Sequence, residues 1–251
     1  MIKLDQAGEV AIVTMVHGKA NTMSTEFCQA LTARLEELRT ASARAIVITG
    51  QGTIFSAGVD LLRLADGGAP YVRTFLPALN AMFETVFSYP KPVVAAINGH
   101  AIAGGCVLAC AADRRLMVRE PGRIGVTELL VGVPFPAGAM EIMRRAVAPQ
   151  RFEEVIFGAA TYAPGDALTR GLIDEVVEPQ ALLDRALAAA TTLAALPPQA
   201  FTQTKRQTRQ DAYERLRRDG ARIDAEAMQI WCAEETLARV RDYVARTLKK
   251  A

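Results

Sequence analysis

The residues best placed to do chemistry lie in two glycine-containing turns. The first turn is Phe55-Ser-Ala-Gly-Val-Asp-Leu61 and the second is Ile97-Asn-Gly-His-Ala-Ile-Ala-Gly-Gly-Cys106. Each comes at or just after an apolar run that predicts a strand. Small residues let a ligand approach the backbone closely, and glycine permits conformations that other residues avoid. Both turns are therefore candidate ligand-binding segments.

The second turn also suits the binding of negative charge. A helix is expected to begin near Gly104, and the first amides of a helix have no partner within it. The helix dipole adds partial positive charge at the same end. Such amides stabilise a developing oxyanion. Taken alone, however, a glycine-rich turn between strand and helix is more often a packing or phosphate-binding feature.

Alternating strands and helices must position these turns. Continuous apolar runs at 45–49 and 93–97 are typical of strands covered on both faces, and 10–16 also favours a strand. Helices are expected at 24–38, with Ser24 as N-cap, at 71–87 and at 104–112. This alternation predicts an α/β fold.

The last fifty residues follow a different pattern. After Pro197-Pro198 the segment 200–250 is charged, favours helix and lacks strand-like runs. Several of its apolar residues need burial, against the core or against a neighbouring subunit: Ile223, Met228, Ile230, Trp231, Leu237 and Val240. We therefore divide the chain into a core at 1–196 and a C-terminal helical oligomerisation region at 197–251.

Composition excludes several classes of function. A net charge of +2 gives no signal for binding a polyanion. The four cysteines form no CxxC pair and have no nearby histidine spaced as a metal ligand, so free thiols and no metal site are expected. The start of the sequence does not resemble a signal peptide. The uncharged stretch 93–112 is interrupted by polar and glycine residues, which favours a cytoplasmic protein over a membrane span.

Together and in this order, the two turns closely resemble the two signature segments of the crotonase (enoyl-CoA hydratase/isomerase) superfamily. The segments 19–24, 125–134 and 167–177 agree with that family, so the resemblance runs from about residue 5 to the C-terminal helices. It implies a crotonase-like spiral of ββα repeats with a C-terminal helical region. It also implies a homotrimer or hexamer, and an acyl-CoA as the ligand of the 1–196 core.

The resemblance also implies the roles of individual residues. The thioester oxygen would accept hydrogen bonds from the amides of Ala57 and Gly104, and Glu128 would be the catalytic acid–base. No metal or redox cofactor is implied, since coenzyme A enters as part of the substrate. The backbone lying along the coenzyme A would be that of Gly58, Val59, Asp60 and Leu61.

Two positions bear on the reaction. Hydratases of this family use two glutamates to hold and activate water, but this sequence has Val107 at the first position and Glu128 at the second. Isomerases that move a double bond from C3 to C2 resemble this pattern, and the loop 133–138 is closer to their form. Isomerisation is therefore predicted, with hydration, thioester hydrolysis or decarboxylation as alternatives.

Three further expectations complete the interpretation. RNA binding, which some crotonase-fold proteins show, is not expected, because the helix at 24–38 has Arg34 but no lysine. A catalytically inactive acyl-CoA binder remains a possible class. His100 is expected to be structural rather than to touch ligand, and Lys91 and Asp113 are expected to be charges at turns.

Overall fold

The computed structural model describes residues 1–247, and in it three successive segments repeat the order strand, strand, helix. The first strand of each repeat joins a six-stranded sheet, and the second joins a three-stranded sheet. This alternation is the ββα spiral that the resemblance to the crotonase superfamily implies. The repeats are β3 (Ala45–Gly50), β4 (Ile54–Ser56) and α2 (Leu61–Phe87); β5 (Val93–Ile97), β6 (His100–Ile102) and α3 (Gly104–Ala111); and β7 (Arg114–Val118), β8 (Ile124–Gly125) and α4 (Ala137–Ala146).

The larger sheet is almost entirely parallel. Its strand order is β1-β2-β3-β5-β7-β9, with β1 (Ile2–Ala7), β2 (Val10–Met15) and β9 (Glu175–Val177) added to the strands of the repeats. Only β1 runs antiparallel to its neighbour. The smaller sheet, β4-β6-β8, is parallel. The turns that leave β4 and β6 therefore meet at one edge of that sheet.

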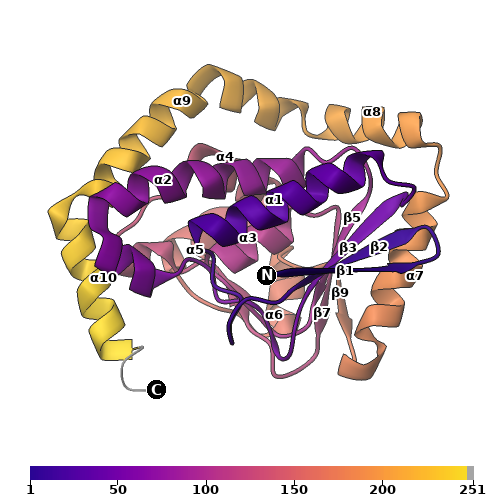
Figure 1. Cartoon of the computed structure of the whole chain (residues 1–251), viewed down its shortest axis with the longest axis horizontal. Helices are drawn as coiled ribbons and strands as arrows, with labels where there is room; N and C mark the ends of the chain where they lie inside the picture. The colour runs from indigo at the N-terminus through magenta and orange to yellow at the C-terminus, as the bar shows by residue number, and fades with distance from the viewer. Residues whose placement is uncertain (248–251) are drawn as a thin grey trace.

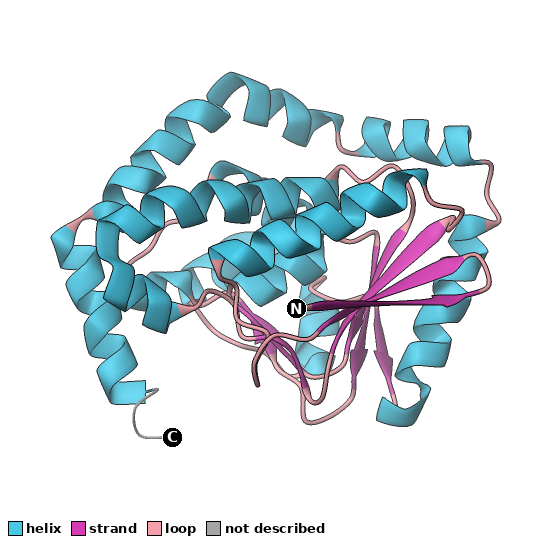
Figure 2. Cartoon of the chain, in the orientation of Figure 1, coloured by secondary structure: helices cyan, strands magenta, loops and turns pink. Residues whose placement is uncertain are grey.

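Both faces of the larger sheet are covered, which explains its continuous apolar strands. In β3, Ala45 and Val47 pack in a core with α7 (Leu182–Ala194). Ile46 and Ile48 point the other way, into the main core with α1 (Thr25–Thr40), α2 and α3. Figure 2 shows the helices on the two sides of the strands.

Short helices lie within and after the third repeat, and three further helices follow α7. The connecting elements are η1 (Glu128–Val131), η2 (Pro149–Arg151), α5 (Phe152–Gly158), α6 (Pro164–Arg170) and η3 (Pro179–Ala181). The C-terminal helices are α8 (Pro198–Thr208), α9 (Gln210–Cys232) and α10 (Glu234–Thr247). Helix α9 packs on α2 and α4, and α10 packs on α2 and η1 (Figure 1).

The core of the same chain therefore supplies burial for the C-terminal segment. Trp231, Leu237 and Val240 are at most 4% exposed, whereas Ile230 remains 46% exposed. Of the two alternatives that the sequence left open, packing on the chain's own core accounts for these three residues.

Two features differ from the sequence-based expectation. The helix expected at 71–87 is preceded by a further helical segment that begins at Leu61, where Asp60 caps it by accepting a hydrogen bond from the Arg63 amide (3.1 Å). The chain then kinks at Gly68, whose φ is 54°. The strands β4, β6 and β8 were not predicted, since two or three residues are too few to show a period of two.

Among the helices of residues 1–247, none is long and apolar enough to cross a membrane. The uncharged stretch 93–112 is divided between β5, β6 and α3.

Candidate active site

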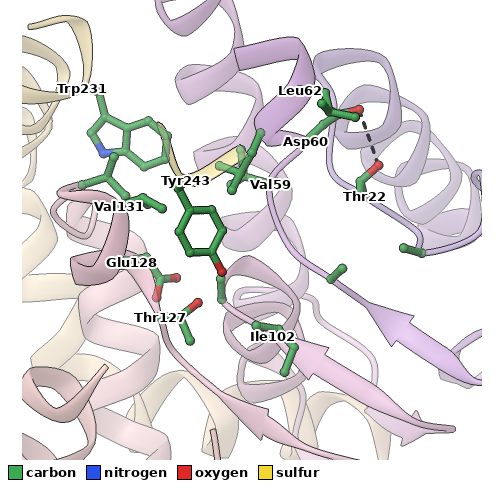
Figure 3. Close-up of a pocket in the computed structure, with 15 residues that line it drawn as sticks. Thr22, Val59, Asp60, Leu62, Ile102, Thr127, Glu128, Val131, Trp231 and Tyr243 are labelled. Carbon is green, nitrogen blue, oxygen red and sulfur yellow. Dashed lines mark hydrogen bonds between the residues drawn. The ribbon is translucent and has the colours of Figure 1, made fainter. Parts of the chain in front are cut away.

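A cavity of about 380 Å³ lies where the two turns meet the segment that contains Glu128 (Figure 3). Its walls come from five parts of the sequence that are far apart along the chain. The lining residues are Ala20, Thr22, Ala57, Val59, Asp60, Leu61, Leu62, Ile102, Ala103, Thr127, Glu128, Val131, Val133, Trp231 and Tyr243. A mostly apolar cavity with a few polar groups is typical of a small-molecule site.

The first turn is held by backbone hydrogen bonds to the loop that precedes α1. The Ala57 amide donates to the Ala20 carbonyl (2.9 Å), the Met23 amide to the Gly58 carbonyl (2.8 Å) and the Asp60 amide to the Met23 carbonyl (3.0 Å). The Val59 amide, between these bonds, donates no hydrogen bond within residues 1–247. The turn thus presents one backbone donor without a partner.

The two turns touch closely at Gly58 and Gly104. Gly58 has φ 83°, and a Cβ there would lie 2.7 Å from the Ile102 carbonyl oxygen and 3.0 Å from the Gly104 nitrogen. Only glycine fits this position, for both reasons. Gly104 is the first residue of α3, and its amide also has no partner in the described chain. Two unpartnered amides, those of Val59 and Gly104, therefore lie at neighbouring places beside the cavity.

This geometry corrects one sequence expectation. Ala57 lines the cavity, as expected of a ligand-contacting residue, but its amide is already bonded to Ala20. The amide two residues later, that of Val59, is the one left free. Sequence reasoning missed this difference because the bond to Ala20 joins segments 37 residues apart. Gly104 occupies the helix-start position that the sequence predicts.

Glu128 begins η1 and faces the cavity (Figure 3). Its Oε2 atom is buried and has no hydrogen-bond partner among the described residues. Burial raises the pKa of the Glu128 carboxyl from 4.5 to about 7, because the charged form loses its solvation. A carboxyl with this pKa exchanges protons readily near neutral pH.

Asp60 is the other carboxylate in the cavity wall, but it is engaged. One of its oxygens caps α2, and the other accepts a hydrogen bond from the Thr22 hydroxyl (3.5 Å). Of the two carboxyls lining this cavity in the described chain, Glu128 is therefore the one with a free oxygen.

Other candidate residues lie away from the cavity wall. Val107 is 1% exposed and packs in the main core from α3. Cys106 and Cys110 are buried free thiols on the same helix. His100 is the first residue of β6, pairs with Ile54 of β4 and is not among the lining residues, in line with a structural role.

The C-terminal helices contribute two lining residues that sequence reasoning did not assign to the site. Trp231 is a buried residue near the C-terminal end of α9. Its indole N–H donates a hydrogen bond to the carbonyl of Pro134 (2.9 Å), a residue that follows the Glu128 segment in the chain. Tyr243 lies on α10, and its ring stands in the cavity with the hydroxyl toward Thr127 and Glu128 (Figure 3). The helical spacing of apolar residues marks Trp231 as buried, but no sequence signal links Tyr243 to residues more than a hundred positions away.

Residues 5–237 match the enoyl-CoA hydratase/isomerase family. A putative enoyl-CoA hydratase from Thermus thermophilus is 34% identical over 211 residues, 82% of each chain. Human mitochondrial enoyl-CoA delta isomerase 1 is 26% identical over 219 residues, 86% of this chain and 72% of the human one. Among solved structures, an enoyl-CoA isomerase from Mycobacterium tuberculosis gives a TM-score of 0.82 at 32% identity, covering 90% of this chain and 98% of that one. Human mitochondrial delta3-delta2-enoyl-CoA isomerase shares the fold, with a TM-score of 0.93 at 24% identity and coverage of 99% and 98%.

Proposed function

Because this chain belongs to the enoyl-CoA hydratase/isomerase family, we propose that it moves the double bond of a 3-enoyl-CoA to the 2-position. The observation that carries this proposal is the single free carboxyl, Glu128, in a cavity whose other carboxylate is engaged. Val107, at the position where hydratases of the family have a second glutamate, is apolar and lies in the core.

The reaction is a proton transfer through a delocalised anion. The thioester oxygen accepts hydrogen bonds from the amides of Val59 and Gly104, which we propose as the oxyanion donors in place of Ala57 and Gly104. The Glu128 carboxylate removes a proton from C2, and the electron pair moves into a dienolate that extends from the thioester oxygen to C4. The same carboxyl returns the proton at C4, which leaves the double bond between C2 and C3.

The remaining groups of the cavity suit this chemistry. Burial keeps the pKa of Glu128 at about 7, so the group accepts and returns a proton at similar cost. The apolar wall strengthens the interaction between the oxyanion and its two donors, because the local dielectric constant is low. The proposed reaction uses no metal and no redox cofactor, since coenzyme A is part of the substrate. The backbone at Gly58, Asp60 and Leu61 is proposed to lie along the coenzyme A.

Hydration of a 2-enoyl-CoA is the alternative, and the curated relatives include proteins named for each of the two activities. It requires that water be held and deprotonated while C2 is protonated, work that two carboxylates share in the family's hydratases. A valine at position 107 contributes nothing to it.

An assay of both substrates side by side separates the two reactions. Isomerisation of a 3-enoyl-CoA raises the absorbance of the conjugated product, hydration of a 2-enoyl-CoA lowers it, and thioester hydrolysis releases free thiol. We expect a higher kcat/KM for isomerisation. Faster hydration than isomerisation by the wild-type enzyme would reject the proposal.

We also propose that the chain assembles as a homotrimer or hexamer, with residues 197–251 contributing contacts. The exposed side chain of Ile230 on the charged helix α9 supports it. Sedimentation velocity at micromolar concentration is expected to give a trimer or a multiple of it. A stable monomer would contradict the proposal.

A further inference from the structure

The cavity is lined in part by a side chain from the C-terminal helix α10. We propose that Tyr243 of α10 limits the length of the acyl chain and makes the site selective for short-chain acyl-CoA. This inference rests on the proposed use of the cavity for an acyl-CoA, and it adds the class of acyl group.

The position of the ring carries the inference. Tyr243 stands in the cavity between Val59 of the first turn and the Thr127–Glu128 segment (Figure 3). The thioester carbon must lie next to Val59 and Gly104, and C2 to C4 must lie within reach of Glu128. The reacting carbons therefore pass beside the tyrosine ring, and carbons beyond them meet the ring and the wall behind it.

That wall is fixed by packing. Trp231 is 2% exposed, its indole N–H is bonded to Pro134, and its ring lies 6.5 Å from that of Phe75. Val131 and Val133, which line the same side, are at most 7% exposed. A longer chain gains no room from these residues without disturbing the core, because close-packed interiors yield little.

The total space is also small. A cavity of 380 Å³ is near the lower end of the usual range for ligand sites, about 300–1,000 Å³. Part of it must hold the end of the pantetheine arm as well as the acyl group. The space left for the acyl chain suits a few carbons.

Tyr243 is separable from the docking of its helix, which makes the inference testable. Helix α10 is anchored by Leu237, Val240 and Val244, all at most 4% exposed. The Tyr243 ring is only partly buried, and its hydroxyl has no hydrogen-bond partner within residues 1–247. Truncating this side chain removes the ring from the cavity and leaves the anchors of α10 in place.

The test measures binding of saturated acyl-CoAs by calorimetry, which requires no turnover. Butanoyl-, hexanoyl- and decanoyl-CoA are compared for the wild type, Tyr243→Ala and Tyr243→Phe. Arg246→Ala, an exposed position on the same helix, is the matched control. We expect the wild type to bind butanoyl-CoA at least tenfold more tightly than decanoyl-CoA, since a misfit in an apolar pocket costs about 10-fold or more.

The inference predicts opposite results for loss of the ring and for the two control changes. Tyr243→Ala should lose most of the preference for the short chain, whereas Tyr243→Phe and Arg246→Ala should keep it, because the ring and not the hydroxyl sets the limit. If the alanine variant unfolds, Tyr243→Val removes the ring with a smaller loss of packing. Equal binding of all three ligands by the wild type, or an unchanged preference in folded Tyr243→Ala, would overturn the inference.

Failure of this inference is distinguishable from failure of the proposed function. An enzyme that shows the expected binding preference but does not isomerise 3-enoyl-CoA leaves the length limit standing and rejects the reaction. An enzyme that isomerises long and short substrates equally well supports the proposed reaction and rejects the length limit.

Discussion

Two carboxyl groups that are largely withdrawn from water are treated in opposite ways by this fold. Asp113, between α3 and β7, accepts hydrogen bonds from the Val93 amide (2.8 Å), from Lys205 (2.7 Å) and from Arg209 (2.8 Å). Lys205, on α8, and Arg209, in the turn between α8 and α9, are themselves at most 7% exposed. This cluster joins the C-terminal segment to the end of the second ββα repeat.

Glu128, in contrast, has an oxygen with no partner, and it lies near two amides that also have none. An unsatisfied buried polar group costs about 1–3 kcal/mol. Both oxygens of Asp113 accept hydrogen bonds from the protein and so stabilise the fold. One oxygen of Glu128 and the amides of Val59 and Gly104 remain available to a ligand. The comparison teaches that, of these two carboxyls, the one that faces the cavity is the one with an oxygen left without a protein partner.

Replacing the free carboxyl should have the largest effect on rate. Glu128→Gln keeps the shape but cannot accept a proton, so isomerisation should fall about 10²–10⁴-fold or more. Acyl-CoA binding, measured by calorimetry, should persist. Glu214→Gln, on an exposed part of α9, is the control. A near-normal isomerisation rate in folded Glu128→Gln would show that Glu128 does not transfer the proton.

Removing a free amide should cost somewhat less. Gly104→Pro deletes the N–H at the start of α3 and should lower kcat about 10²–10³-fold, measured on protein whose fold is checked by circular dichroism because Ala103 before it has φ 51°. Gly104→Ala keeps the amide but places a Cβ 3.0 Å from the Met23 sulfur, a flexible side chain, so its loss should be smaller. Equal losses in both variants would mean that crowding, not the missing donor, is responsible.

Replacing Asp113, the carboxyl bonded to Lys205 and Arg209, should lower the stability of the fold and leave kcat unchanged. Asp113→Asn leaves Lys205 and Arg209 buried without their counter-charge and should lower the free energy of unfolding by about 3–5 kcal/mol. Glu226→Gln breaks an exposed ion pair with Arg222 and should cost at most about 1 kcal/mol. Urea unfolding measures both. A loss of kcat in folded Asp113→Asn would place Asp113 in the catalytic machinery.

The smallest effect is on the pH dependence of the rate. Burial raises the pKa of Glu128 to about 7, and the first step needs the ionised form. The value of kcat/KM should therefore fall about tenfold per pH unit below about 7 and level off above it. A rate that stays constant from pH 5 to pH 8 would show that Glu128 is not the group that accepts the proton.

The sequence predicts the parts of this fold that depend on local pattern. The apolar runs at 45–49 and 93–97 predict β3, which is one residue longer, and β5, and the start of α3 at Gly104 follows from its glycines. The first part of α2, from Leu61 to the kink at Gly68, was missed because this helical segment is short and is set by the Asp60 cap, whereas the expected helix lies beyond the kink. Local propensity is a weak guide where a cap and tertiary packing oppose it.

The same limit applies to the site. Glu128 and Gly104 could be placed by resemblance, since each lies in a short contiguous motif. Which amide of the first turn is free could not, because that depends on the bond from Ala57 to Ala20 in another loop. Asp113 was expected to be a turn charge, and its two cationic partners lie more than ninety residues along the chain. Contacts of this kind leave no periodic signal in a single sequence.

The contribution of α10 to the cavity has a consequence for synthesis. A ribosome makes the two turns and Glu128 well before it makes Tyr243, and chains begin to fold from the N-terminal side as they emerge. A growing chain therefore acquires its reactive groups first and its cavity wall last. Any product that stops short of α10 would carry the acid and both amides in an open cleft. Such a chain would lack the feature that we propose selects the acyl group.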